Sequence, residues 1–246
     1  LPKFPRDATD RNRTSPFAFT GNKFEFRMLG SAQSISGPNV VLNTAVAESL
    51  RQYADVLEGA DDFEKALHDL IRDVIRKHKR IIFNGNGYDD AWIREAESRG
   101  LLNLKATPDC VPYYLAPKNI ELFARHRVYS ETEIRARYEI KLDNYSKVLH
   151  IEALTMLDMV WKDILPAVSA YSKSLADAAL SKNALNSEID CRFETELVKK
   201  LSALTASAVS KAQDLEFAVA DVKKCGDSLS LARYYRDEIF SAMKEL

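Results

Sequence analysis

The residues best suited to chemistry are charged side chains near the start of the chain. Arginine can bind a carboxylate or a phosphate through two parallel hydrogen bonds, and a glutamate carboxylate is a hard oxygen ligand for a divalent cation. In the run Lys23-Phe24-Glu25-Phe26-Arg27, a carboxylate lies between two cations at every second position. This arrangement fits a site that holds a metal and anions together; the alternative is an exposed salt-bridge ladder on an edge strand. The polar residues of this stretch are Asp7, Asp10, Arg11, Asn12, Arg13, Lys23, Glu25 and Arg27.

A β-hairpin is the element expected to position these side chains. Residues 17–20 and 24–28 are rich in aromatic residues and flank a Gly-Asn pair, which is typical of a hairpin turn. In the second arm, strand alternation puts the apolar residues on one face and the charged residues on the other. The hairpin should therefore present Lys23, Glu25 and Arg27 together.

The same stretch resembles a known enzyme signature. Arg-Asn-Arg-Thr-Ser at 11–15, followed by Lys-Phe-Glu-Phe-Arg at 23–27, resembles a motif near the end of the catalytic domain of glutamine synthetases. The full run 12–27 resembles the large type III branch of that family. So do Lys-Arg-Ile-Ile-Phe-Asn-Gly-Asn-Gly-Tyr at 79–88 and the segment 144–154. The resemblance covers nearly the whole chain and weakens toward its C-terminus.

The resemblance implies an activity and a role for each site residue. Glutamine synthetases join ammonia to the side-chain carboxylate of glutamate through a γ-glutamyl phosphate, using ATP and Mg²⁺ or Mn²⁺. By position, Glu25 resembles a carboxylate that binds the metal bridging the nucleotide phosphates, and Arg27 a catalytic arginine that meets glutamate or the transferring phosphoryl group. Arg13 resembles a catalytic arginine that stabilises charge on the phosphates, and Lys23 a basic residue beside the nucleotide. Ala18 stands where ordinary members carry a further arginine.

The rest of such a site is expected to lie elsewhere in a longer protein. The other metal ligands and the main nucleotide-binding elements of the family should lie upstream of Leu1. We therefore interpret the chain as a C-terminal piece and expect it to have no ligase activity by itself. By resemblance, the parent enzyme would take glutamate and ammonia as substrates. It would be cytoplasmic and would assemble as hexameric rings paired into a dodecamer.

The elements beyond this site are predicted from an uneven use of glycine and proline. Residues 118–246 contain one proline, Pro166, and one glycine, Gly226, whereas the first 117 residues contain the other fourteen. At average usage the longer stretch would hold roughly nine glycines and six prolines. Because β-rich and α/β folds need frequent turns, this half should consist of long helices.

Apolar residues spaced by three and four positions confirm the helical period in that half. Short breaks near residue 183 and at Gly226 would let the helices fold back on one another. The predicted fold class is therefore mainly α, a short N-terminal β-hairpin followed by an antiparallel bundle of long helices. The four stripes are Ile134, Tyr138, Leu142, Tyr145 and Leu149; Leu154, Leu157, Trp161, Ile164, Val168, Tyr171 and Leu175; Leu197, Leu201, Leu204, Ala208, Leu215, Ala218 and Val222; and Ala232, Tyr235, Ile239 and Met243.

Three regions are predicted along the chain. Residues 1–58 would form the incomplete end of a catalytic domain, 59–117 a helix pair with an irregular connector, and 118–246 the long-helix bundle. A first helix of about twenty residues is expected to begin at Pro38, with Val41, Ala45, Ala47, Leu50 and Leu57 on or near one apolar stripe. Asp61 is expected to cap the second helix. Pro166 should bend its helix mildly rather than end it, because the apolar stripe continues through it.

Composition excludes several classes of function. The net charge of −1 provides no general attraction for nucleic acid or anionic lipid. No apolar run approaches the about 20 residues that cross a bilayer. Three cysteines without a CxxC spacing argue against a disulfide framework or a zinc site.

The remaining polar features have ordinary interpretations. The basic run at 76–80 is interpreted as a solvated helix end, the Asn-Gly-Asn-Gly at 84–87 as a tight turn, and His126 as a contact with a helix dipole. Met156, Met159 and Trp161 are assigned to the core. The alternative function is a free-standing helical interaction or oligomerisation module, in which the N-terminal charges play no catalytic part.

Overall fold

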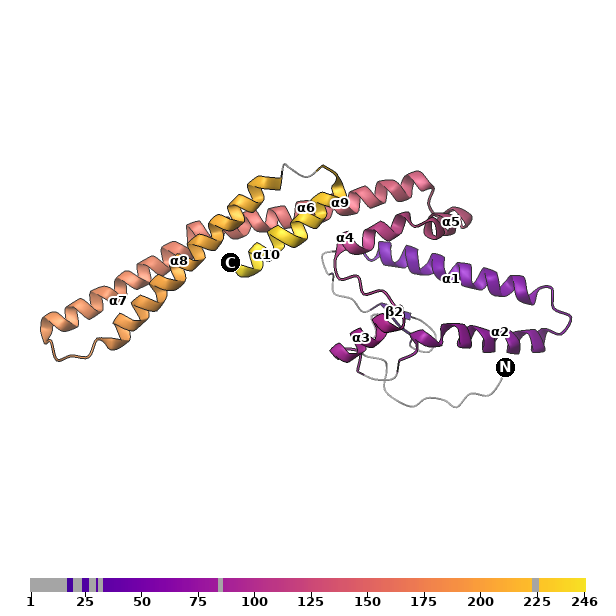
Figure 1. The fold of residues 1–246 in the computed structure, drawn as a ribbon, viewed down its shortest axis with the longest axis horizontal. Coiled ribbons are helices and arrows are strands. Elements are labelled where there is room, and N and C mark those ends of the chain that lie inside the picture. The colour runs from indigo at the N-terminus through magenta and orange to yellow at the C-terminus, as the bar shows by residue number, and fades with distance from the viewer. Residues whose placement is uncertain (1–16, 20–23, 27–29, 31–32, 84–85, 223–225) are drawn as a thin grey trace. The chain divides into compact units, whose positions relative to one another are not determined.

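The computed structural model describes residues 17–19, 24–26, 30, 33–83, 86–222 and 226–246, and these are mainly helical (Figure 1). This confirms the mainly α prediction and the helical bundle. The chain divides into two compact units, Leu1–Leu104 with Ala116–Thr132, and Lys105–Leu115 with Glu133–Leu246. None of the helices in the described part of the chain has the length and apolar composition needed to cross a membrane.

Two short strands occur near the start of the first unit. β1 (Phe17–Phe19) and β2 (Phe24–Phe26) pair antiparallel, with Ala18 opposite Glu25. The predicted turn and the end of the second arm fall on 20–23 and 27–29, which lie outside the described residues. The β-hairpin as a whole is therefore not confirmed.

The first unit also contains a pair of helices close to the predicted positions. α1 (Ser36–Leu57) begins two residues before Pro38, its predicted start, and packs against α2 (Phe63–His78). Asp62, and not Asp61 as predicted, caps α2, because its carboxylate accepts a hydrogen bond of 3.0 Å from the backbone N–H of Lys65. The last turn of α2 is basic, which favours the negative end of the helix dipole.

Shorter elements complete the first unit. A 3₁₀ turn, η1 (Lys79–Ile81), follows α2, and α3 (Asp90–Ser98) begins after the N-cap Asp89. α5 (Pro117–Arg125) starts at a proline, whose fixed φ suits the first helical position, and packs against α1.

The second unit is built from long helices with short additions. α4 (Thr107–Cys110) and η2 (Val111–Leu115) precede the long α6 (Glu131–Met159). α7 (Leu165–Leu185) is followed by α8 (Arg192–Asp221), which folds back along it (Figure 1). The chain ends in α9 (Ser228–Tyr234), η5 (Tyr235–Ile239) and α10 (Phe240–Glu245).

A π-helical turn joins α6 to α7. This turn, η3 (Val160–Ile164), comes just before Pro166. The helix continues beyond the proline as α7, which agrees with the prediction that Pro166 does not end it. A proline inside a helix cannot donate to the preceding turn and its ring crowds that turn. The wider π turn, with its i to i+5 bonding, accommodates this locally.

The core of the second unit lies where α6, α8 and the C-terminal helices meet. Leu149 and Leu157 of α6 pack with Leu215 of α8 and Ile239 of η5. All four belong to the predicted stripes, so these stripe positions are confirmed as core. A smaller cluster of Val111, Leu142 and Ala232 attaches the α4–η2 segment to the bundle.

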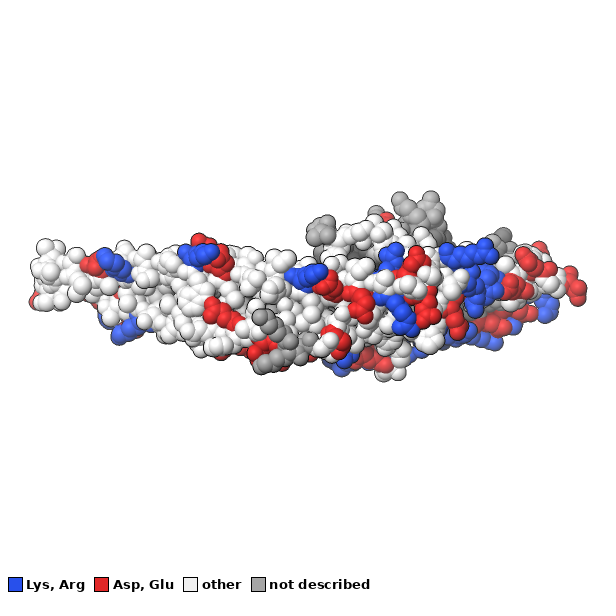
Figure 2. Space-filling model, turned by 90° about the horizontal axis from the view of Figure 1, so that it is seen from above, with Lys and Arg blue, Asp and Glu red and all other residues white. Residues whose placement is uncertain are grey.

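Other predicted core positions are exposed. Met159 is 50% exposed and Trp161 37%, so their assignment to the core was wrong. Leu204, Tyr171 and other apolar side chains of α7 and α8 are also exposed. Two helices cover only one side of each other, and Leu175 is the buried residue of α7 in the described part of the chain. On the face shown in Figure 2, the pair of helices α7 and α8, called the arm from here on, carries few charged side chains.

Truncating the shared core should destabilise the fold much more than truncating the arm. Leu215→Ala removes a side chain with 0% exposure and should cost about 2–5 kcal/mol of unfolding free energy in urea titrations. Leu204→Ala, on the same helix but 57% exposed, is the matched control and should change stability by about 0.5 kcal/mol or less. Equal losses in the two variants would contradict the assignment of the core.

Candidate functional site

The structure describes one of the predicted site residues, Glu25. It is the central residue of β2, lies opposite Ala18 and is half-buried. Arg13, Lys23 and Arg27 lie outside the described residues. Their shared strand face and their roles stay predictions.

Metal ligation by Glu25 would need partners from beyond the described residues. Within the described ranges, no group of three or more His, Cys, Asp or Glu side chains is placed to hold a metal ion. A single carboxylate does not make a Mg²⁺ or Mn²⁺ site, because such ions are usually six-coordinate. Glu25 could therefore contribute to a metal site only together with other ligands.

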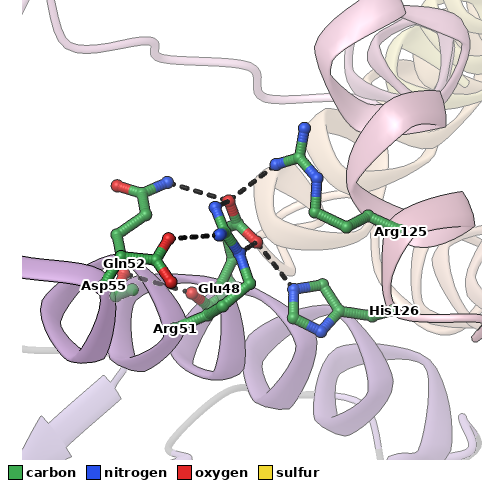
Figure 3. A network of polar contacts seen from close by, with 8 residues as sticks. Glu48, Arg51, Gln52, Asp55, Arg125 and His126 are labelled. Carbon is green, nitrogen blue, oxygen red and sulfur yellow. Dashed lines mark hydrogen bonds and ion pairs between the residues drawn. The ribbon is translucent and has the colours of Figure 1, made fainter. Parts of the chain in front are cut away.

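A dense polar network in the first unit surrounds the carboxylate of Glu48 on α1 (Figure 3). Its Oε1 accepts hydrogen bonds from Arg51 Nη2 at 2.9 Å, Gln52 Nε2 at 2.9 Å and Arg125 Nη1 at 2.7 Å. Its Oε2 accepts from Arg51 Nε at 3.0 Å and lies 2.8 Å from His126 Nε2. The Glu48 side chain is 12% exposed. The network therefore ties α1 to the end of α5.

The end of α5 has a backbone conformation that directs two of these partners. His126 is the C-cap, and Arg127 has a φ of 55°, in the left-handed region where glycine is usual. The N–H of Arg127 donates to the carbonyl of Ala124, and that of Val128 to the carbonyl of Phe123, both at 3.0 Å. This is a Schellman ending built on an arginine, at a local cost of about 1–2 kcal/mol.

The network holds Glu48 in its ionised form. Hydrogen bonds from Arg51, then Gln52 and then His126, keep the pKa of the Glu48 carboxyl far below its usual range. The same contact with Glu48 raises the pKa of Arg51. A carboxylate with such a low pKa is a poor proton acceptor at neutral pH. Its chemistry is therefore that of an ion-paired connection between two helices.

Sequence reasoning missed this network. His126 was predicted to contact a helix dipole; it lies at the C-cap of α5, and its ring also contacts Glu48 of α1. The available signal was Glu48 itself, which lies seven residues after Val41 and so falls on the predicted apolar stripe of α1. A charged residue in such a position needs partners, but periodicity does not say which residues supply them.

Polar contacts in the second unit are also structural. Arg236 forms an ion pair with Asp109 of α4 and another with Asp237, whose Oδ1 lies 2.6 Å from Arg236 Nε. The Tyr235 hydroxyl lies 3.0 Å from His150 Nδ1. These contacts connect η5 to α4 and α6 beside the apolar core.

The Glu48 network makes stability depend on pH in a defined direction. The pKa of Glu48 is lower in the folded state than in the unfolded state. Its contribution to the free energy of unfolding is therefore complete above the unfolded glutamate pKa of about 4.3, and it is lost as the pH falls toward the folded-state pKa. Glu48→Gln should therefore lower the urea midpoint at pH 7, and its difference from the unaltered chain should shrink below about pH 4.3.

The exposed Glu121 of α5 provides the matched control. Glu121→Gln should change the urea midpoint little at either pH. If the urea midpoint of Glu48→Gln were lower than that of the unaltered chain by the same amount from pH 7 to pH 3, the charge of Glu48 would not be what stabilises the unit.

Comparison with known proteins assigns the chain to a family. Residues 66–183 match the family described as "Glutamine synthetase C-terminal domain". A glutamine synthetase of Butyrivibrio fibrisolvens is 40% identical over 253 residues, which cover 99% of this chain and 35% of that protein. A type-3 glutamine synthetase of Dictyostelium discoideum is 44% identical over 184 residues, covering 74% of this chain and 25% of the relative.

A third relative has the same relation to the chain. The glutamine synthetase of Bacteroides fragilis is 30% identical over 210 residues, covering 82% of this chain and 29% of its own length. The chain thus spans about a third or less of the curated relatives it matches. These matches confirm the resemblance drawn from the sequence motifs. The chain belongs to the glutamine synthetase family, and residues 66–183 match the C-terminal domain of that family.

Proposed function

We propose that this chain is part of an ATP-dependent glutamate–ammonia ligase that forms glutamine through a γ-glutamyl phosphate. The observation that carries this proposal is the 40% identity to a glutamine synthetase along 99% of the chain. A free-standing interaction module would not account for a match that covers both the charged N-terminal motif and the helices.

Within this function, the N-terminal motif would supply part of the active site. Glu25 would bind a Mg²⁺ or Mn²⁺ ion, which when bound neutralises charge on the ATP phosphates. Arg27 would orient glutamate or the transferring phosphoryl group, and Arg13 would stabilise charge on the phosphates. Lys23 and Arg13 would contact the nucleotide. The half-buried position of Glu25 on β2, paired with β1, supports its role as a metal ligand, because a strand holds a ligand more firmly than a loop.

The helical part would serve structure or subunit contacts in the parent enzyme. Exposed apolar side chains on α7 and α8, among them Leu180, Phe193 and Phe217, support a contact role. We infer a cytoplasmic homo-oligomer of hexameric rings, paired into a dodecamer, for the parent. The family resemblance carries that inference.

The 246-residue chain alone should form no glutamine. It should be purified from a host that lacks its own glutamine synthetase and assayed with glutamate, ammonia, ATP and Mg²⁺ or Mn²⁺. The expected rate equals the protein-free background, because most of the active site would lie outside the chain. Glutamine formation that scales with chain concentration would contradict this prediction.

In the full-length parent enzyme, Glu25→Gln should lower kcat by about a hundredfold or more and raise the metal concentration needed for half-maximal activity. The amide keeps the size of the side chain but removes the charge that binds the cation. Glu139→Gln on α6, where Glu139 is exposed, is the matched control and should leave both quantities unchanged. An unchanged metal dependence in Glu25→Gln would remove Glu25 from the metal site.

A further inference from the structure

A pocket of about 720 Å³ opens in the first unit at the C-terminal end of α2. Its cations come from α2, η1 and the C-cap of α3. We call it the basic pocket. Its lining residues are Ile75, Arg76, Lys79, Arg80, Ile82 and Arg99.

The positive charge of the basic pocket is only partly compensated. Arg99 forms an ion pair with Glu95. Arg76, Lys79 and Arg80 are exposed and form no ion pair with any residue that the structure describes. Three converging cations outweigh the helix dipole, which places only about half a negative charge at the end of α2. An anion in the pocket would therefore be attracted.

One wall of the pocket is already fixed in position. Nη1 of Arg99 donates to the backbone carbonyls of Arg80 at 3.2 Å and Ile82 at 3.0 Å. Its guanidinium lies 5.3 Å from the ring centre of Trp92, which stacks on Phe83 with ring centres 3.8 Å apart. A ligand would therefore not have to order this wall, which lowers the entropic cost of binding.

Gly100 shapes the same wall. Its φ of +72° ends α3 in the left-handed region, which glycine adopts without strain. A Cβ atom at this position would lie 3.5 Å from Nη1 of Arg80. The guanidinium of Arg80 therefore lies against the glycine, close to the anchored Arg99.

We propose that the basic pocket binds a small phosphorylated anion. Arg76, Lys79 and Arg80 would hold the phosphate oxygens, because guanidinium and ammonium groups donate several charge-assisted hydrogen bonds to them. The exposed side chains of Ile75 and Ile82 would contact a less polar part of the ligand. The proposal is independent of the ligase activity and of the motif at 13–27.

The form of the pocket favours a small molecule over nucleic acid. Its volume lies within the range of about 300–1,000 Å³ typical of small-ligand sites. Nucleic-acid binding usually needs a basic surface that extends along several phosphates, whereas this chain has a net charge of −1. The interpretation of 76–80 as a solvated helix end described the run but not the pocket that it lines.

Trp92 offers a direct measurement. The chain has two tryptophans, so Trp161→Phe leaves Trp92 beside Arg99 as the single reporter. This 246-residue variant would be titrated with pyrophosphate while Trp92 fluorescence and heat of binding are followed. Saturable binding is expected, and citrate, an anion with similar charge but no phosphate, should bind at least about tenfold more weakly.

Substitutions locate the binding. Arg76→Ala and Arg80→Ala should each weaken pyrophosphate binding at least about tenfold. Lys77→Ala is the matched control, because Lys77 belongs to the same basic run but does not line the pocket. It should leave the affinity within about twofold, as expected for a screened surface charge. The double substitution Lys23→Ala and Arg27→Ala should leave it unchanged. Circular dichroism would confirm that each variant is folded.

Several outcomes would overturn the proposal. Absent or non-saturable binding of pyrophosphate would do so, as would equal losses in Arg80→Ala and Lys77→Ala. Citrate binding as tightly as pyrophosphate would indicate an acidic protein segment as the occupant. Loss of binding in the Lys23 and Arg27 variant, with retention in Arg80→Ala, would place the phosphates at the N-terminal motif. None of these results would decide whether the parent enzyme makes glutamine.

Discussion

Burial of one apolar stripe against two others is the interaction on which the second unit depends. Leu149 and Leu157 of α6 are enclosed because both α8 and the C-terminal helices contribute facing side chains, Leu215 and Ile239 among them. Each such side chain stabilises the fold by about 1.5–3 kcal/mol through removal from water. Where α7 and α8 have only each other, the same type of stripe stays half exposed. A third helix therefore decides where the core ends.

The first unit is held together differently. The buried residues of α1 are Thr44 and Glu48, both polar, and α2 has none. A carboxylate held by donors from two helices links α1 to α5 in place of an extended apolar core. Removing one partner from such a network leaves the Glu48 charge without its donors, so arrangements of the helices that separate these partners are penalised. The Glu48 network therefore selects one arrangement of these helices.

Much of the fold could be predicted from the sequence, and the exceptions have physical causes. Scarce glycine and proline predicted the long helices, and the 3–4 spacing identified Leu149, Leu215 and Ile239 as core. The same spacing included Leu204 and Trp161, because periodicity identifies a face but not whether a partner covers it. The contact between Glu48 and His126 joins residues 78 positions apart, which local pattern cannot supply. For the candidate site, the roles stay predictions from the motif resemblance, and Glu25 is the predicted site residue that lies within the described part of the chain.

The π turn at η3 also sets the angular phase of the arm. Each residue in an α-helix advances the side-chain direction by about 100°, so the extra residue of a π turn rotates everything after it by that amount relative to α6. The apolar face of α6 can thus meet the C-terminal helices while the face of α7 meets α8. Insertions or deletions of whole turns would preserve this phase.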